Sequence, residues 1–422
     1  MRTLLDRRSA ILCVLALTAV ACSSGGSGIA PAVEIATPTV LSADTPVGVT
    51  GGLVQGALSE TNPEVIAFKG IPYAAPPVGD LRWKPPTPVA AWTDVRNTST
   101  FGSRCVQGGR NATDQSEDCL FLNVFAPREI AEPLPVMVWI HGGGYTGGAG
   151  SNGIYDGTNL AARDVVLVSI NYRLNVFGFY AHPALSAESP HGASGNYGLL
   201  DMVASLEWVR DNIAAFGGDP NRVTIFGESA GAGAVMSLMV VPQAEGLYHG
   251  AIAESDWIYG WDRPLSGTGS AEADGTRVAE ELGVSDPAAS LDELRAASAV
   301  DVLAAFQAAG NSPFTREDAA WAPNVDGWVI PDDPIDMYET GRQHDVPLVV
   351  GMNGNEGSMF SRGLQVDDGA GFEAHVRQVY PQQADAALAH YAVGDDSAVA
   401  AAVDHLIHDM YFAGPVRLHA RA

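Results

Sequence analysis

Val223-Thr224-Ile225-Phe226-Gly227-Glu228-Ser229-Ala230-Gly231 is the stretch of this sequence that decides the fold. A β-branched and aromatic run leads into G-x-S-x-G, and small residues continue to position 241. This pattern predicts a strand, a sharp turn and a helix, with the serine hydroxyl exposed at the carboxyl edge of a sheet. Glycine suits both flanking positions because a side chain there would collide with the strand or the helix. The turn also places the Ala230 N–H at a helix N-terminus, where it can donate to an anion.

A second glycine-rich segment, His141-Gly142-Gly143-Gly144-Tyr145, follows the apolar run 135–140. Successive glycines allow backbone N–H groups to converge on a developing oxyanion. Alone, this segment could be a loop without function. Because it precedes the serine turn in the chain order of an acyl-transfer site, the two segments together favour the two halves of such a site.

An acidic residue follows a third apolar run, at residues 346–350, in the loop Gly351-Met352-Asn353-Gly354-Asn355-Glu356. In a serine hydrolase of this layout, the acid follows the serine and lies just past a strand end. Glu356 fits that position. By position alone, a solvated loop glutamate is an equally good interpretation.

Strand patterns alternate with helical ones along most of the chain. Strands are predicted at 136–141, 165–171, 223–227, 251–254 and 347–351. One face of a predicted helix carries Leu199, Val203, Leu206, Val209 and Ile213. The alternation indicates an α/β fold with a mostly parallel, doubly wound sheet in one large domain. Residues 270–310, rich in Ala, Glu and Leu, are expected to be helices inserted over the carboxyl edge of that sheet.

The chain resembles the type-B carboxylesterases, the family that includes cholinesterases and many bacterial esterases. The likeness covers residues from about 45 to the end, and its other matching runs are 68–74 (FKGIPYA), 117–124 (EDCLFLNV), 171–173 (NYR), 195–201 (GNYGLLD) and 216–220 (FGGDP). The resemblance implies an α/β-hydrolase fold that cleaves carboxylic esters through an acyl-enzyme intermediate, with no cofactor. A catalytically silent, cholinesterase-like binding or adhesion protein is the alternative, although such proteins usually lose the serine or the glycines.

The resemblance also implies roles for individual residues. Ser229 would be the nucleophile and Glu356 the triad acid, with oxyanion donors at Gly143, Gly144 and Ala230. Arg82 with Glu117, and Arg173 with Asp201, would be structural ion pairs.

Three further residues are expected near the site. Glu228 is predicted to be a buried, hydrogen-bonded carboxylate beside the nucleophile. Ser255 follows a predicted strand and is expected to lie close to the site, whereas Asp256 stands where the family usually has glycine.

The triad also needs a histidine after the acid, to take the serine proton and return it to the leaving alcohol. The histidines after Glu356 are His375, His390, His405, His408 and His419. None lies in a segment like the family's histidine-glycine-x-glutamate loop. We therefore expect the sequence to stop before its catalytic histidine and before the last strand and helix of the sheet. His405 and His408 could instead be two ligands of a metal, but no third ligand is evident and we expect no metal.

The N-terminus has the pattern of a bacterial export signal. Arginines precede the apolar stretch 9–21, which is too short to span a bilayer. Ala19-Val20-Ala21-Cys22 resembles a lipoprotein cleavage site, so residues 1–21 would be removed and Cys22 lipidated. Ordinary signal cleavage remains an alternative, because leucine is more usual at position 19. Residues 22–44 are expected to be a flexible tether, and residues 45–422 the hydrolase domain, incomplete at its C-terminal end.

The four cysteines agree with export. Cys13 leaves with the signal and Cys22 takes the lipid, which leaves Cys105 and Cys119 as a pair in an oxidising compartment. Their spacing also resembles the family's N-terminal disulfide loop. The protein is therefore expected in the cell envelope or outside the cell.

Charge excludes one class of partner. The formal net charge of −26 becomes about −28 when Arg2, Arg7, Arg8 and Asp6 leave with the signal (three positive charges and one negative). There is no basic patch and lysine occurs only twice, which argues against nucleic acid. The expected partner is a small-molecule ester, with a membrane contacted only through the lipid anchor. Residues 105–119 contain no tryptophan, which argues against a choline ester.

Overall fold

The computed structural model describes residues 39–108, 114–256, 263–284, 291–309, 322–364 and 366–422. The predicted signal, Cys22 and most of the tether lie outside the described residues. The chain divides into Met1–Thr37 and a compact unit, Pro38–Ala422. In that unit β1 (Thr39–Val40) pairs with β10 (Glu129–Ile130), and the side chain of Leu41 is buried. Residues 39–41, within the predicted tether, are therefore held by strand pairing and apolar burial.

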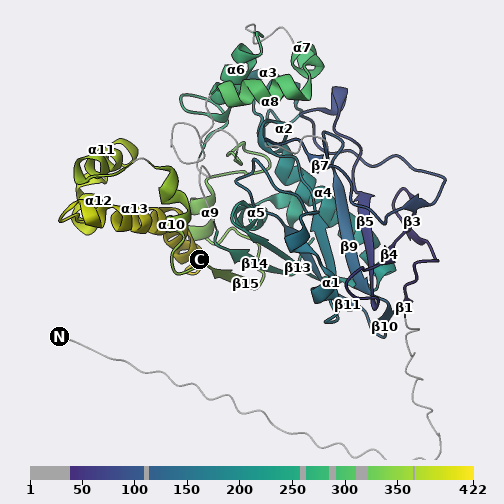
Figure 1. Cartoon of the computed structure of the whole chain (residues 1–422). Coiled ribbons are helices and arrows are strands. Elements are labelled where there is room, and N and C mark those ends of the chain that lie inside the picture. Colours follow the sequence, from purple (N-terminus) through teal and green to yellow (C-terminus); the bar gives the residue numbers. More distant parts are fainter. Residues whose placement is uncertain (1–38, 109–113, 257–262, 285–290, 310–321, 365) are drawn as a thin grey trace, which may run out of the picture. The chain divides into compact units, whose positions relative to one another are not determined.

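An eight-stranded sheet runs through the centre of this unit in the order β15-β14-β13-β11-β12-β9-β5-β4 (Figure 1). Its strands are β4 (Ala57–Leu58), β5 (Val65–Pro72), β9 (Phe121–Pro127), β11 (Leu134–Ile140), β12 (Val166–Ile170), β13 (Gly218–Glu228), β14 (Gly250–Glu254) and β15 (Leu348–Gly351). Neighbours from β12 to β15 are parallel, whereas β9, β5 and β4 add an antiparallel edge. The predicted α/β fold with a mostly parallel sheet is confirmed.

Short strands make three smaller pairings beside this sheet. They are β2 (Val47–Val49) with β3 (Gly52–Gln55), β3 with β6 (Arg96–Asn97), and β7 (Arg104–Cys105) with β8 (Gln115–Ser116). The two edge strands of the large sheet are β4 and β15. On β15, the side chain of Val349 is 62% exposed.

Helices bury the central strands on both faces, which is why β12 is buried at every residue. The predicted amphipathic helix is α4 (Tyr197–Asn212), and α5 (Ala230–Leu238) packs on β13 and β14. Every residue of α5 is buried, because its small side chains allow the helix to lie close against the sheet. Shorter helices are α1 (Thr158–Ala161), α2 (Asn175–Phe179) and α3 (Pro183–Glu188).

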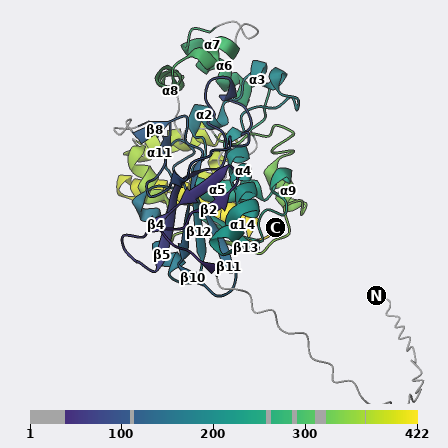
Figure 2. The same cartoon turned by 90° about the vertical axis from the view of Figure 1, so that its right-hand side faces the viewer.

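The helices expected within residues 270–310 are also present. They are α6 (Ala271–Glu281), α7 (Leu291–Ala296) and α8 (Ala299–Ala308), which lie together in both views (Figure 2). They share an apolar cluster with α2 and the segment around Trp83. This cluster attaches the inserted helices to the sheet domain.

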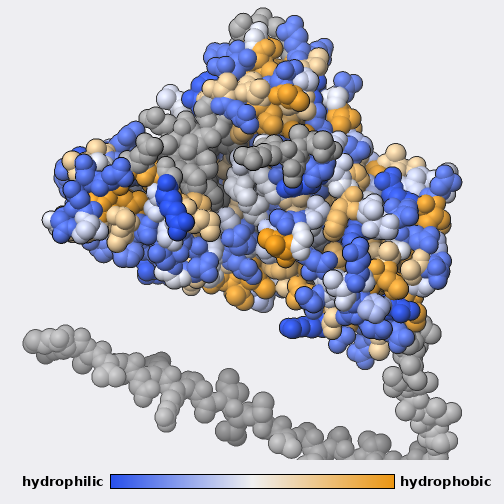
Figure 3. All heavy atoms as spheres, in the orientation of Figure 1, coloured by the Kyte–Doolittle hydropathy of each residue, from blue (hydrophilic) through white to orange (hydrophobic). Residues whose placement is uncertain are grey.

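The C-terminal part of the chain is helical. It comprises α9 (Pro334–Glu339), α10 (Gly357–Phe360), α11 (Gly369–Val379), α12 (Ala384–His390), α13 (Val399–His408), the π-helical turn Asp409–Ala413 and α14 (Gly414–His419). Helices α11 to α13 have an apolar cluster of their own around Phe372, Val376 and Leu406. Hydrophilic residues cover much of the face in Figure 3, as the net charge leads one to expect. None of the helices in the described ranges is long and apolar enough to cross a membrane.

Candidate active site

Ser229 lies in the turn between β13 and α5, as predicted. Its φ of +57° is in the left-handed region, which a non-glycine residue adopts only under strain. The Ser229 N–H donates to the carbonyl of Glu254 on β14 at 2.9 Å. A Cβ at Gly231 would lie 2.1 Å from the carbonyl oxygen of Ile140, so α5 can begin this close to β11 only with glycine there.

The glycine-rich loop after β11 packs against this turn. Because β11 and β13 are parallel neighbours, their carboxyl ends meet at the same edge of the sheet. A Cβ at Gly142 would lie 3.1 Å from the Ser229 Cβ and 2.5 Å from the Glu228 carbonyl oxygen. Segments more than 80 residues apart in the sequence therefore form one site, because strand pairing brings their ends together.

Three backbone N–H groups are candidates for holding an oxyanion at this site. Gly143 and Gly144 have φ angles of +112° and +61°, and Ala230 is the first residue of α5. Within the described part of the chain, these three N–H groups donate no backbone hydrogen bond. They are therefore available to an oxygen that gains negative charge in a reaction at Ser229.

Glu356 lies between β15 and α10 and is 7% exposed, so the interpretation as a solvated glutamate is wrong. Its Oε1 accepts hydrogen bonds from Ser255 Oγ at 2.6 Å, from the Asn353 N–H at 2.7 Å and from Asn353 Nδ2 at 3.1 Å. No described residue donates to Oε2. Hydrogen bonds from Ser255 and Asn353 thus fix one oxygen of this carboxylate.

The hydrogen bond from Ser255 to Glu356 was not predicted from the sequence, although Ser255 was expected near the site. Ser255 follows β14 and Glu356 follows β15, which are parallel neighbours. The signal that could have found the contact was therefore the shared position of both residues just past a strand end.

Glu228 departs from its prediction, because its side chain is exposed rather than buried. It is the last residue of β13 and points away from the buried face that carries Val223 and Ile225. Partial desolvation raises the pKa of Glu228, and the carboxylates of Glu356 and Glu254 raise it further. This edge of the sheet therefore concentrates negative charge beside the nucleophile.

Two of the described histidines after Glu356 bond to groups other than Ser229 and the Glu356 carboxylate. His408 Nδ1 accepts from the main-chain N–H of Glu356 at 3.3 Å and does not reach the carboxylate. His419 is buried against the ring of Tyr338, and its Nδ1 lies 2.6 Å from Asp256 Oδ2. In the described ranges no histidine hydrogen-bonds to Ser229 or to the Glu356 carboxylate. The Asp256–His419 pair was not anticipated from the sequence, since its partners come from the end of β14 and from α14.

His141, at the start of the glycine-rich loop, is a structural residue. Its ring is buried and stacked on Tyr172 with centroids 4.5 Å apart, and its Nδ1 lies 2.8 Å from the Gly142 carbonyl oxygen. Burial lowers its pKa from 6.5 to about 4. The ring is therefore neutral at pH 7, and with the carbonyl as acceptor Nδ1 carries the proton.

This burial predicts acid sensitivity of the fold. The pKa of His141 is about 4 in the native state and 6.5 in the unfolded state, so as pH falls below 6.5 the unfolded chain takes up a proton that the native state does not. The free energy of unfolding should thus be highest above pH 6.5 and fall by about 3 kcal/mol towards pH 4 through this group. Urea unfolding at pH 7.5 and 4.5 measures the difference. His141→Gln should remove the share of this pH-dependent change in unfolding free energy that comes from His141. The exposed control His390→Gln should keep it. Equal pH dependence in the wild type and in His141→Gln would contradict the assignment.

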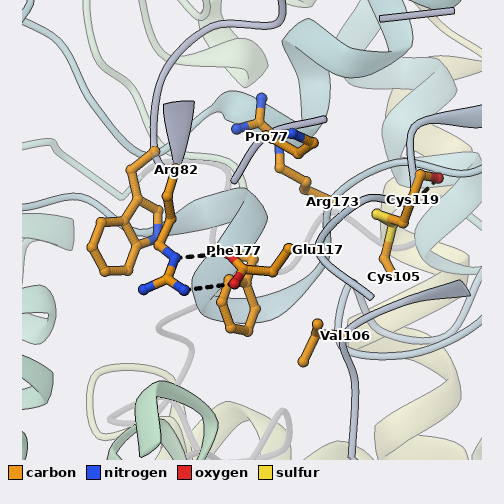
Figure 4. Close-up of a pocket in the computed structure, with 9 residues that line it drawn as sticks. Pro77, Arg82, Cys105, Val106, Glu117, Cys119, Arg173 and Phe177 are labelled. Carbon is orange, nitrogen blue, oxygen red and sulfur yellow. Dashed lines mark hydrogen bonds and ion pairs between the residues drawn. A yellow bond between two sulfur atoms is a disulfide. The ribbon is translucent and has the colours of Figure 1, made fainter. Parts of the chain in front are cut away.

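The predicted disulfide and both predicted ion pairs are present. Figure 4 shows the two cysteines and the Arg82–Glu117 pair. Cys105 and Cys119 are bonded, and Glu117 accepts two bonds from Arg82, at 2.5 and 2.7 Å. These residues line a small pocket with Arg173, which pairs with Asp201 at 2.7 Å. The pocket belongs to this structural network. Among the described residues, no three His, Cys, Asp or Glu side chains are grouped to hold a metal ion.

Comparisons with known proteins agree with this geometry. A family model described as the carboxylesterase family matches residues 43–421. Fumonisin B1 esterase of Sphingopyxis macrogoltabida is 41% identical over 376 residues, which cover 87% of this chain and 67% of that protein. Para-nitrobenzyl esterase of Bacillus subtilis is 40% identical over 318 residues, which cover 73% of this chain and 62% of the relative.

Solved structures give the same result. A PNB esterase matches with a TM-score of 0.77 at 36% identity, covering 89% of this chain and 77% of that one. The described fold is thus the α/β-hydrolase fold. The chain spans about three fifths to two thirds of the length of the two curated relatives.

Proposed function

The chain belongs to the carboxylesterase family, and we propose that it carries the nucleophile, the acid and the oxyanion hole of a serine hydrolase that cleaves carboxylic esters. The observation that carries the proposal is the contact of the glycine-rich loop with Ser229, where a Cβ at Gly142 would lie 3.1 Å from the serine Cβ. The N–H groups of Gly143 and Gly144 follow Gly142 in this loop and donate to no backbone carbonyl of the described residues.

The reaction proceeds in two steps through an acyl-enzyme. Ser229 Oγ attacks the ester carbonyl and gives its proton to an imidazole, while N–H groups of Gly143, Gly144 and Ala230 hold the oxyanion. The imidazole returns the proton to the leaving alcohol. Water, deprotonated by the same imidazole, then attacks the acyl group and releases the acid and free Ser229.

The imidazole belongs to a histidine outside residues 1–422. Two observations support this part of the proposal: no described histidine bonds to Ser229 or to the Glu356 carboxylate, and the curated relatives are longer than this chain. Glu356 Oε2 is the atom that would accept from that imidazole and fix its orientation.

The silent binding protein is the less favoured reading, because the serine turn and the glycine-rich loop are both intact in their geometry. The relatives named above have esterase in their names, so simple aryl esters are suitable first substrates. A panel of esters that differ in acyl and alcohol group would establish which acyl and alcohol groups the protein prefers.

A rapid-mixing assay tests the proposed function. The protein encoded by the complete open reading frame that contains these residues is mixed with p-nitrophenyl acetate. We expect a burst of p-nitrophenol stoichiometric with the protein, followed by slower turnover, because the acyl-enzyme forms before water releases it. Absence of both burst and turnover across acetyl, butyryl and benzoyl esters would favour the binding protein instead.

Export is a separate part of the proposal and rests on the N-terminal sequence alone. Residues 1–21 would be removed and Cys22 acylated, which holds the protein at the cell envelope through several acyl chains. Intact-mass measurement of the mature protein from a bacterial host tests this. An unmodified N-terminus at or near residue 22 would indicate a freely secreted protein.

A further inference from the structure

Gln107, inside the disulfide loop, is bonded to the glycine-rich loop through both ends of its amide. Its Oε1 accepts from the Gly148 N–H at 2.9 Å, and its Nε2 donates to the Gly148 carbonyl at 2.8 Å. The same Nε2 donates to the carbonyl of the disulfide residue Cys105 at 3.0 Å. Because Gln107 is 7% exposed, water cannot readily replace these bonds.

Gly148 closes the turn that shapes the oxyanion loop. The N–H groups of Thr146 and Gly147 both donate to the Gly143 carbonyl at 3.1 Å. Gly148 has a φ of +108°, and a Cβ there would lie 2.5 Å from the Gly142 carbonyl oxygen. A displacement of Gly148 would therefore be transmitted to Gly142, which packs against Ser229, and to Gly143, the next residue of the loop.

Two buried asparagines hold the same two loops at other points. Asn175 Nδ2 donates to the Val106 carbonyl at 2.8 Å, and its N–H donates to the Tyr145 carbonyl at 2.7 Å. Asn171 Nδ2 donates to the Cys119 carbonyl at 3.2 Å, while its Oδ1 accepts from the Gly150 N–H at 2.9 Å. Gln107 differs from them because it belongs to the disulfide loop itself (Figure 4 shows its neighbours Cys105 and Val106).

We propose that Gln107 is a positioning residue for the oxyanion hole and that it couples the Cys105–Cys119 bridge to turnover. This inference rests on the proposed esterase function. The bridge fixes the chain two residues before Gln107, and the Gln107 amide in turn fixes Gly148. The oxyanion N–H groups are then held where charge develops, so the contact stabilises the transition state more than the bound substrate.

Kinetics of the complete gene product with p-nitrophenyl butyrate test the coupling. Gln107→Met keeps the length of the side chain but leaves the Gly148 N–H and carbonyl unpaired. It should lower kcat about 10-fold to 100-fold and change KM by less than about threefold. Asp118→Asn is the matched control, because this residue of the same loop is exposed and its carboxylate bonds to neither Gln107 nor Arg104, so both constants should stay unchanged.

The double variant Cys105→Ala/Cys119→Ala should also lower kcat. In the Gln107→Met background, the same change should lower kcat by at most about twofold more, since the two act through one contact. Unchanged kcat in Gln107→Met, a loss confined to KM, or fully multiplicative losses would overturn the inference. If Gln107→Met does not fold, Gln107→Glu serves instead, because it keeps an acceptor for the Gly148 N–H and should give an intermediate loss.

Hydrogen exchange followed by mass spectrometry separates this inference from the proposed function. Peptides covering residues 142–150 should exchange faster in Gln107→Met and in the disulfide-free variant than in the wild type. If the wild type hydrolyses no ester, the proposed function fails, whereas the exchange result still decides whether Gln107 holds the loop. Unchanged exchange would show that it does not.

Discussion

Replacing Ser229 with alanine should lower the turnover of p-nitrophenyl acetate by the complete gene product about 10⁶-fold. The serine hydroxyl forms the acyl-enzyme. Without it no acyl-enzyme can form, and the acid, the imidazole and the oxyanion donors have no covalent step to assist. What remains over the reaction in water, roughly 10³-fold, would come from the oxyanion donors and substrate binding alone. The variant should fold, because alanine keeps the backbone of the turn and removes one half-buried hydroxyl.

The control for this variant is Ser237→Ala. Ser237 lies on the same helix and its Oγ donates to the Gly233 carbonyl at 2.8 Å, so its loss should leave turnover nearly unchanged. A fluorophosphonate probe should label the wild type and Ser237→Ala but not Ser229→Ala. Hydrolysis that persists in Ser229→Ala at more than a thousandth of the wild-type rate would place the nucleophile elsewhere.

Residues 1–422 expressed alone should hydrolyse the same ester about 10⁶-fold more slowly than the complete gene product, because removing the imidazole costs about as much as removing the serine. This chain should also fail to react with a fluorophosphonate, although Ser229, Glu356 and the oxyanion loop are present. Circular dichroism and non-reduced peptide mapping of the Cys105–Cys119 bridge would confirm that it is folded.

Brisk, Ser229-dependent hydrolysis by residues 1–422 would show that a histidine of this chain is the base. His408 would be the first to test, because its Nδ1 already lies 3.3 Å from the main-chain nitrogen of Glu356. Loss of that activity in His408→Gln, with His390→Gln as the exposed control, would then replace our assignment.

Local features were predictable because each depends on neighbours in the chain. The small residues around Ser229 suit a tight strand–turn–helix. The sequence predicted that a side chain at position 231 would collide with its surroundings, and a Cβ at Gly231 would indeed lie 2.1 Å from the Ile140 carbonyl oxygen. The strands around 166–170 and 250–254 were visible as apolar runs, since parallel strands are buried on both faces. The Cys105–Cys119 bridge and the Arg82–Glu117 pair also followed from the sequence and its resemblance to a family.

By itself, the sequence determined the nucleophile turn, the glycine-rich loop and the acid as candidate parts of one site. Only the tertiary structure decided how they are held: the bond from Ser255 to Glu356 joins residues 101 positions apart, and that from Gln107 to Gly148 joins residues 41 apart. It also paired Asp256 with His419 and left Glu228 exposed. The physical reason is that hydrogen bonds between distant side chains depend on strand order and on which face each residue presents, and no local pattern encodes either.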